Sequence, residues 1–276
     1  MTDDNPGDDL VGSFLLQNTG NGLVSKKNEC FCELKTDAMG VDVADFNRDG
    51  LYDIYIGANL RNTLLQQQSD GSFVDVTQVT GADPLQGDLT KMSWGTIFVD
   101  FDNDGLLDIL VAEGDHWFEQ STQPIIVIDL PIDLMKQTET ESGIRFERVS
   151  EQYGLTQEGS WRTVIAMDHN HDGVQDLLVT DVEERPLLFM SQGCTENAWV
   201  AIDGPIGTRI EIEAGGKTQY ATIDSHSSFA GSHSARAHIG LGEHEIIDRL
   251  TLTTANGNIV EVDTPLAARR IITFSP

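Results

Sequence analysis

The chain has 276 residues, of which 39% are hydrophobic, so it is long enough to bury a core and to hold one or two domains. Its 45 acidic and 17 basic residues give a formal net charge of −28, which argues against nucleic acid and anionic membranes as partners. No run of residues approaches the roughly 18–20 apolar positions of a membrane-spanning helix, so membrane insertion is not expected.

The first part of the chain is polar. Residues 1–9 are acidic, and we expect them to form a frayed leader rather than a signal peptide. Ser13–Val24 has the pattern of a strand, a Gly/Asn turn and a second strand. Cys30 and Cys32 share one strand face, where a disulfide between them would be strained. Free thiols, or a bridge from Cys194 to one of the pair, both remain open.

A nine-residue pattern begins at Asp45 and recurs twice, with Asp or Asn at positions 1, 3, 5 and 9 and Gly at position 6. The candidate ligands are Asp45, Asn47, Asp49, Leu51 and Asp53 in loop 1; Asp100, Asp102, Asp104, Leu106 and Asp108 in loop 2; and Asp168, Asn170, Asp172, Val174 and Asp176 in loop 3. Alternate side chains of a tight loop converge on one point, and the residue at position 7 offers its backbone carbonyl. Such a cage provides the six to eight oxygens that Ca²⁺ prefers.

Three copies of the loop therefore predict about three Ca²⁺ sites. The alternative is a set of turns without metal, in which three or four crowded acids per turn would repel one another. The loops do not resemble EF-hands, because position 12 is Ile56, Val111 or Val179 rather than Glu. Their flanks alternate as strands, so each loop is predicted to be the turn of a β-hairpin. The predicted strands are Val41–Ala44 and Ile54–Ile56, Thr96–Val99 and Ile109–Val111, and Thr163–Met167 and Leu177–Val179.

A second hairpin follows each loop. Asn62–Val74 follows loop 1, and Leu64 and Leu187 each lie 19 residues after position 1 of their loops. Successive loops begin 55 and then 68 residues apart, which we attribute to an insertion or long loop at Gln123–Ser142, with a fourth strand at Ile144–Val149. Four-stranded units repeating every 40–60 residues are typical of β-propeller blades.

After Cys194 the repeat ends and strands alternate without a metal loop. The strand candidates include Trp199–Ile202, Arg209–Glu213, Gln219–Ile223 and Arg270–Phe274. This pattern predicts a small antiparallel β domain.

Two segments resemble known families. Met39–Asn59 resembles the FG-GAP/VCBS repeat of integrin-α-type propellers, and Trp94–Gly95 and Trp161 open the other two copies. Ile206–Ile210 and Gly240–Gly242, among others, resemble the ASPIC/UnbV domain, which follows FG-GAP repeats in the cartilage acidic protein family. The resemblance implies Ca²⁺ at the loops and a usually extracellular setting.

The predicted fold is all-β, with a partial β-propeller over residues 10–194 and a C-terminal antiparallel β domain over 195–276. The propeller would hold three blades and half of a fourth, which are too few to close a ring. Further blades are therefore expected from another segment or chain.

The predicted function is a Ca²⁺-binding interaction or adhesion module that binds a protein or a glycan. It is expected to be extracellular, on the cell surface or periplasmic. The alternatives are a catalytic or non-catalytic part of a polysaccharide-acting enzyme, and a structural subunit of a surface assembly. No nucleophile elbow, phosphate loop or dinucleotide fingerprint occurs, so no catalytic residue is predicted. Trp117 and Phe118 are candidates to contact a ligand.

Overall fold

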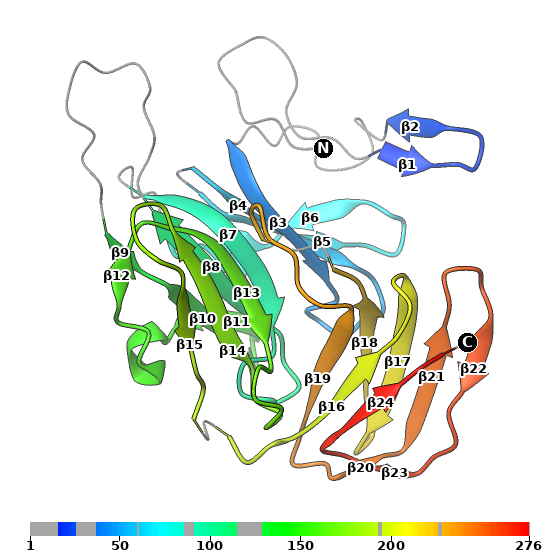
Figure 1. Ribbon diagram of the computed structural model, residues 1–276. Helices are drawn as coiled ribbons and strands as arrows, with labels where there is room; N and C mark the ends of the chain where they lie inside the picture. The colour runs from blue at the N-terminus through cyan, green and yellow to red at the C-terminus, as the bar shows by residue number, and fades with distance from the viewer. Residues whose placement is uncertain are drawn as a thin grey trace, which may run out of the picture.

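The computed structural model describes residues 16–25, 37–59, 61–85, 91–114, 129–192, 195–225 and 228–275. Their regular secondary structure is almost entirely β-strand, arranged as blade-like sheets and a C-terminal β domain (Figure 1). The predicted all-β class is therefore confirmed. The proposed leader, the three cysteines, Trp117 and Phe118 lie outside the described residues. None of the helices in the described parts of the chain has the length and apolar character needed to cross a membrane.

Three sheets correspond to the three predicted blades, and in each the strands neighbour one another in chain order. Blade 1 contains β3 (Ala38–Ala44), β4 (Asp53–Ala58), β5 (Thr63–Gln67) and β6 (Phe73–Asp75). Blade 2 contains β7 (Met92–Val99), β8 (Asp108–Gly114), β10 (Asp133–Thr140) and β11 (Gly143–Arg148). Blade 3 contains β13 (Trp161–Met167), β14 (Asp176–Asp181) and β15 (Leu187–Phe189). Short helices, α1 (Thr77–Thr80) and η1 (Ser150–Tyr153), follow blades 1 and 2.

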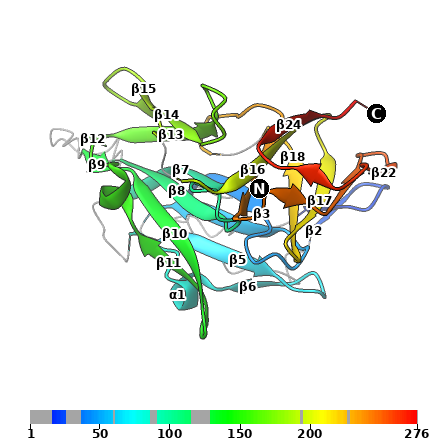
Figure 2. The same ribbon diagram turned by 90° about the horizontal axis from the view of Figure 1, so that it is seen from below.

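The middle blade packs on both of its faces. Along β8, Ile109 and Val111 join a core with Tyr55 of blade 1, while Leu110 joins a core with Leu177 of blade 3. Successive side chains of a strand point to opposite faces, so a continuous apolar run is needed where both faces are covered. Each fully buried side chain of this size contributes roughly 1.5–3 kcal/mol. The result is a fan of sheets with β3, β7 and β13 innermost (Figure 2).

The expected insertion at Gln123–Ser142 is wrong in its extent. Asp133–Thr140 forms β10, the third strand of blade 2, and pairs with β8 and β11. Its second half is polar because the Lys136 side chain contacts the acidic groups of loop 2 and the Gln137 side chain donates to the carbonyl of Phe46 in loop 1, which disguised the strand in the sequence. Just before it, β9 (Leu130–Pro131) pairs with β12 (Glu158–Gly159).

The two outer blades expose apolar side chains. Val41 and Val43 on β3 are 42% and 47% exposed, and Leu188 and Met190 at the edge of blade 3 are 43% and 39% exposed. The fan is therefore open at both ends. The predicted N-terminal hairpin forms from β1 (Leu16–Asn18) and β2 (Leu23–Ser25), a two-stranded sheet set apart from the blades (Figure 1).

The C-terminal domain has its own core. One sheet has the order β19-β16-β24, a second has the order β18-β17-β21-β22, and β20 pairs with β23. The strands are β16 (Ala198–Asp203), β17 (Thr208–Ala214), β18 (Lys217–Ile223), β19 (Arg236–Gly242), β20 (Ile246–Ile247), β21 (Arg249–Thr253), β22 (Ile259–Glu261), β23 (Leu266–Ala267) and β24 (Arg270–Thr273). The predicted antiparallel arrangement holds except for β24, which lies parallel to β16.

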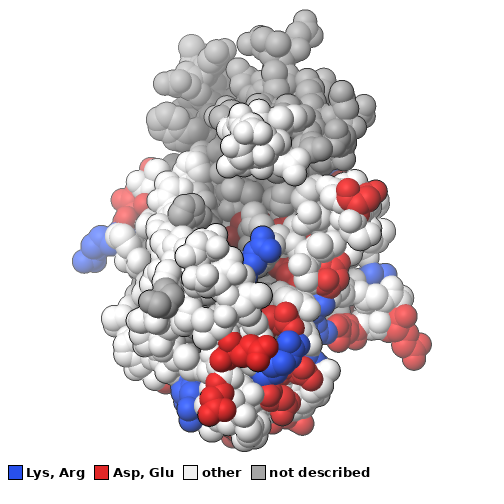
Figure 3. Space-filling view, turned by 90° about the vertical axis from the view of Figure 1, so that its right-hand side faces the viewer, with Lys and Arg blue, Asp and Glu red and all other residues white. Residues whose placement is uncertain are grey.

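Charges of both signs gather on the lower part of the face seen in Figure 3. The ion pairs of the C-terminal domain include Arg249 with Glu211 at 2.5 Å and with Glu213 at 3.4 Å. These side chains are exposed, so each pair adds little to stability.

Candidate metal centre

The three acidic loops adopt the same backbone. At position 6 the glycines have φ angles of 84°, 85° and 86°, and at position 4 Arg48, Asn103 and His171 have φ angles of 61°, 58° and 60°. A positive φ costs glycine nothing, which explains why it stands after position 5 in each copy. His169 and His171, at the even positions 2 and 4 of loop 3, are exposed. The repeated sequence thus folds into a repeated turn.

Position 9 closes each loop. One carboxylate oxygen of Asp53, Asp108 and Asp176 accepts a hydrogen bond from the backbone N–H of position 2, at 3.3, 3.2 and 2.9 Å. The other oxygen accepts a second backbone N–H, at 2.8 Å in every case. The donor lies in the third strand of the same blade or, in blade 3, just after that strand. These donors are Gln67, Gln137 and Ser191. The buried carboxylate therefore joins the hairpin turn to the next strand.

In loops 1 and 3 hydrogen bonds hold the side chains at positions 1, 3 and 5 within the turn. Both oxygens of Asp45 accept backbone N–H groups of the loop, at 2.8 Å from Gly50 and 3.1 Å from Asp49. Asp168 repeats both bonds, at 3.0 and 3.1 Å. The Asn at position 3 donates to the Asp at position 5, and the backbone N–H of position 7 donates to the same Asp.

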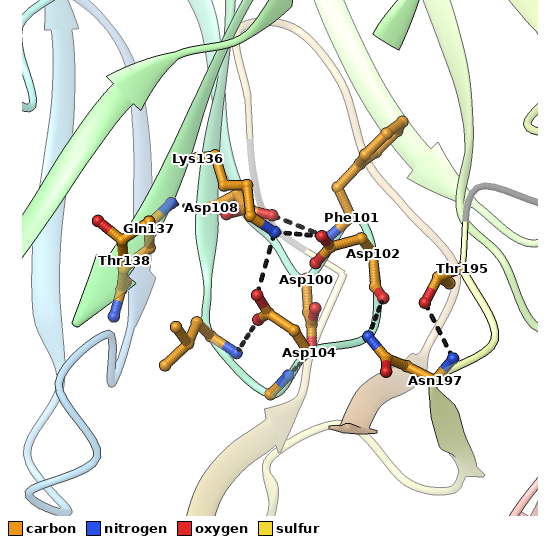
Figure 4. A network of polar contacts seen from close by, with 12 residues as sticks. Asp100, Phe101, Asp102, Asp104, Asp108, Lys136, Gln137, Thr138, Thr195 and Asn197 are labelled. Atoms are coloured by element: carbon orange, nitrogen blue, oxygen red, sulfur yellow. Dashed lines mark hydrogen bonds and ion pairs between the residues drawn. The ribbon is translucent and has the colours of Figure 1, made fainter. Parts of the chain in front are cut away.

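Loop 2 is the most metal-like of the three (Figure 4). Carboxylate oxygens of Asp100, Asp102 and Asp108 lie within 4.8 Å of one another. Asp100 Oδ2 accepts the N–H of Gly105 at 2.9 Å, but Asp100 Oδ1 and Asp102 Oδ1 are buried without a hydrogen-bond partner. Buried oxygens of this kind cost free energy until a donor or a cation reaches them. The residues of loop 2 therefore fit a hard cation.

The electrostatics of loop 2 point the same way. Burial, followed by repulsion from Asp108 and Asp104, raises the pKa of Asp100 well above its usual range. Burial raises the pKa of Asp108 to about 8. Acids that hold protons so strongly lack sufficient positive charge nearby. A divalent cation would lower these pKa values by supplying that charge.

One cation is built into the protein at this site. Lys136 Nζ, from β10, contacts Asp102 and lies 3.0 Å from Asp104 Oδ2 (Figure 4). Burial lowers the pKa of Lys136, but the hydrogen bonds to Asp102 and Asp104 outweigh it and raise the pKa. Four aspartates and one lysine give loop 2 a charge of −4 + 1 = −3. The candidate ligand side chains of loops 1 and 3 sum to −3, from three aspartates each, because their position 3 is Asn.

Sequence reasoning missed Lys136 because its strand was assigned to an insertion. The extra carboxylate at position 3 of loop 2 was the available signal, since a fourth acid needs a counter-charge. Gln66 in blade 1 and Met190 in blade 3 occupy the position equivalent to Lys136. Each directly precedes the residue whose backbone N–H bonds the position 9 carboxylate.

The loops also form the surface on which the C-terminal domain lies. In loop 1 the hydroxyl of Tyr52 hydrogen-bonds Thr222 of β18. In loop 2 Asn103 Oδ1 lies 2.7 Å from His238 Nε2 of β19. In loop 3 a Cβ at Gly173 would overlap the indole of Trp199 in β16. Each acidic loop therefore contacts a different strand of the C-terminal domain.

Comparisons with known proteins agree with this architecture. Residues 45–111 match the FG-GAP-like repeat family, and residues 203–276 match the ASPIC and UnbV family. A relative, "Cartilage acidic protein 1" of Xenopus tropicalis, is 27% identical over 151 residues, which cover 54% of this chain and 20% of the relative. The chain thus spans about a fifth of the length of the curated relative that it matches. It carries an FG-GAP-like segment followed by an ASPIC/UnbV segment.

Proposed function

We propose that this chain is a Ca²⁺-binding interaction module of the cell exterior. The observation that carries the proposal is the pair of buried, unpartnered oxygens of Asp100 and Asp102 within a cluster of three carboxylates. The FG-GAP-like match and the similarity to a cartilage acidic protein support an extracellular or cell-surface setting. Millimolar extracellular Ca²⁺ would fill sites of modest affinity.

In this proposal the ion has a structural role. Positions 1, 3, 5 and 9 of each loop, with the position 7 carbonyl, would hold Ca²⁺, and the position 9 carboxylate also keeps the loop closed. A bound ion would bring together acids that otherwise repel one another. Because the loops contact β16, β18 and β19, ordered loops would also give the C-terminal domain a rigid platform for binding a protein or glycan partner.

Lys136 provides the first test. The K136Q variant replaces the lysine by glutamine, which is the residue that blade 1 has at the equivalent position (Gln66). Loop 2 thereby loses the positive charge of Lys136. We expect tighter Ca²⁺ binding at loop 2 by about tenfold, since an opposing charge next to the ion is removed. We also expect lower stability in EDTA, because four acids then stand without a counter-charge. Calorimetric Ca²⁺ titration and melting in EDTA measure the two effects.

The matched control is K91Q, which removes a lysine that lies 3.4 Å from Glu113, outside the metal loops. It should leave Ca²⁺ affinity unchanged. Weaker Ca²⁺ binding in K136Q than in the parent protein would contradict the assignment of loop 2 as a metal site that Lys136 partly neutralises.

A second candidate function is a structural subunit of a surface assembly. The exposed apolar residues on both outer blades, Val41 and Val43 on one and Leu188 and Met190 on the other, favour it. Exposed apolar blade faces are suited to covering by further blades or by another chain. We expect light scattering after size exclusion to show self-association that V41T/V43T reduces. A monomer at all concentrations would count against this candidate.

The alternative of polysaccharide hydrolysis receives less support from the described residues. Outside the loops Glu113 and Asp133 form an interacting acidic pair, and both side chains are fully buried. Burial, followed by repulsion from Asp133, raises the pKa of Glu113 to about 9. A hydrolytic pair must reach its substrate, and this pair lies within blade 2.

A further inference from the structure

Blade 3 ends one strand short of the other two blades. Blades 1 and 2 have four strands each, and their outermost strands are β6 and β11. Blade 3 has the order β13-β14-β15, and no strand among the described residues pairs with the outer side of β15. In Figure 2, β15 lies at the upper margin of the fan. An open strand edge of this kind can pair with another polypeptide.

The two complete blades show how a fourth strand is held. In each, one leucine of the third strand donates its backbone N–H to a hydroxyl group and accepts a backbone N–H at its carbonyl. The bonds are Leu64 to Thr77 Oγ1 at 2.7 Å and from Val76 at 2.9 Å in blade 1, and Leu134 to Ser150 Oγ at 2.9 Å and from Val149 at 2.8 Å in blade 2. The partners belong to a repeated pattern, Phe-x-x-Val-Ser/Thr, at residues 73–77 and 146–150.

Leu188 is the equivalent residue of blade 3. Like Leu64 and Leu134, it stands three residues before the residue whose N–H bonds the position 9 carboxylate, which here is Ser191. Alternate residues of a strand direct their N–H and C=O groups to opposite sides. Since Ser191 N–H faces Asp176, the backbone groups of Leu188 face the open edge. Leu188 is 43% exposed, whereas Leu64 and Leu134 are 0% and 1% exposed.

The turn that follows blade 2 is also uncovered. In the turn that follows blade 1, a Cβ at Gly81 would lie 3.1 Å from the carbonyl oxygen of Phe146, in the fourth strand of the next blade. Gly154 has the same place after η1 and the same φ of 75°. No described atom lies within 4 Å of a Cβ at Gly154. A fourth strand in blade 3 would fill this space as β11 does beside Gly81.

We propose that the open edge of β15 binds an extended segment of a partner polypeptide, which becomes the fourth strand of blade 3. The segment should carry the pattern Phe-x-x-Val-Ser/Thr. The 276-residue sequence contains this pattern twice, and both copies are already in place in blades 1 and 2. A third copy therefore has to come from outside these residues. The inference rests on the proposed role as an interaction module and names the kind of partner.

Each part of the pattern has a role at this edge. The valine N–H would donate to the carbonyl of Leu188, and the hydroxyl of the serine or threonine would accept the N–H of Leu188. By the register of blades 1 and 2, the phenylalanine would lie on the same face as Leu187 and Phe189, which pack against the core shared with blade 2. Main-chain pairing then provides affinity, and the side-chain positions provide specificity.

The probe is a fluorescent synthetic peptide with the sequence of Gly143–Ser150, the fourth strand of blade 2 and the two residues after it. We expect saturable binding to the full chain in millimolar Ca²⁺, measured by fluorescence anisotropy. The same peptide N-methylated at the Val149 position lacks the donor for Leu188, so it should bind at least about tenfold more weakly. Hydrogen exchange at Leu188 and Met190 should slow when the peptide is bound.

L188P tests the edge from the side of the protein. Its backbone N–H faces away from β14, and proline is tolerated at such a position of an edge strand, so blade 3 should keep its fold. We expect peptide binding at least about tenfold weaker than in the parent protein. I259P is the matched control, because Ile259 is an exposed residue of β22, the edge strand of a C-terminal sheet. It should bind the peptide as the parent protein does.

Absence of saturable binding, or equal affinity for the peptide and its N-methylated form, would overturn the proposal even if L188P did not fold. Self-association that L188P abolishes, without peptide binding, would assign the edge to a second copy of the chain and would also overturn it. Ca²⁺ titration of the parent protein and L188P should agree. A failure at the β15 edge therefore remains distinguishable from a failure of the proposed Ca²⁺ sites.

Discussion

Removal of Ca²⁺ with EDTA is expected to lower the melting temperature by on the order of 10 °C or more. Binding at a hundred times the dissociation constant contributes about 2.7 kcal/mol per site, and three sites would contribute about 8 kcal/mol. For a chain of this size, 1 kcal/mol corresponds to roughly 2–4 °C. Calorimetry or fluorescence melting of the same sample with and without EDTA measures the difference.

EDTA saturated with Ca²⁺ is the control for the chelator itself. Mg²⁺ should restore less stability than Ca²⁺, because it prefers rigid octahedral coordination with retained waters. The C-terminal domain should respond as well, since Tyr52, Asn103 and Gly173 of the loops contact it. Faster hydrogen exchange in β19 after chelation is the expected sign. An identical melting curve in EDTA and Ca²⁺ would contradict the proposed structural metal.

Substitution of Asp108 by alanine is expected to lower the free energy of unfolding by about 2–5 kcal/mol even in EDTA. Asp108 accepts the backbone N–H groups of Phe101 and Gln137, at 3.2 and 2.8 Å, and its side chain is 1% exposed. The alanine variant leaves both donors buried without an acceptor, and each such loss costs about 1–3 kcal/mol. Urea unfolding in EDTA measures this contribution without the metal.

D104N is the matched comparison within the same loop. Asp104 is more exposed than Asp108, and asparagine can still accept the backbone N–H of Leu106, which lies 2.9 Å from Asp104 Oδ1. We expect D104N to weaken Ca²⁺ binding while changing stability in EDTA by less than about 1 kcal/mol. The reverse result, in which D108A unfolds normally in EDTA and loses only Ca²⁺ binding, would show that position 9 serves only as a ligand and not as a structural group.

The sequence predicted the features that depend on neighbouring residues. Each loop holds its turn through a glycine with positive φ and through bonds between residues at most seven positions apart, such as Asp108 with Phe101. Such geometry is local, so the nine-residue pattern was sufficient to identify it. The repeat of strand and loop then indicated the blades, since each unit places the same residues in the same register.

The polar strand β10 could not be recognised from the spacing of apolar residues in the sequence. A strand is recognised in sequence by alternating apolar residues, but the side chain of Lys136 faces Asp102 and that of Gln137 donates to the carbonyl of Phe46, so their positions are polar. Its role is evident only when the partner strand is known. The parallel pairing of β24 with β16 was hidden for a similar reason, since side-chain alternation does not encode strand direction.

The sequence by itself determined the three acidic turns, the blade repeat and the β-rich C-terminal domain, because each of these follows from short-range spacing and alternation. Only the tertiary structure decided what the turns contact. Lys136 reaches Asp102 across 34 positions of the chain, and His238 reaches Asn103 across 135. Contacts at such separations depend on how whole sheets pack against one another. A cavity lined by Asp42 of blade 1 and Tyr220 of the C-terminal domain also exists only because this domain lies against the loop ends of the blades.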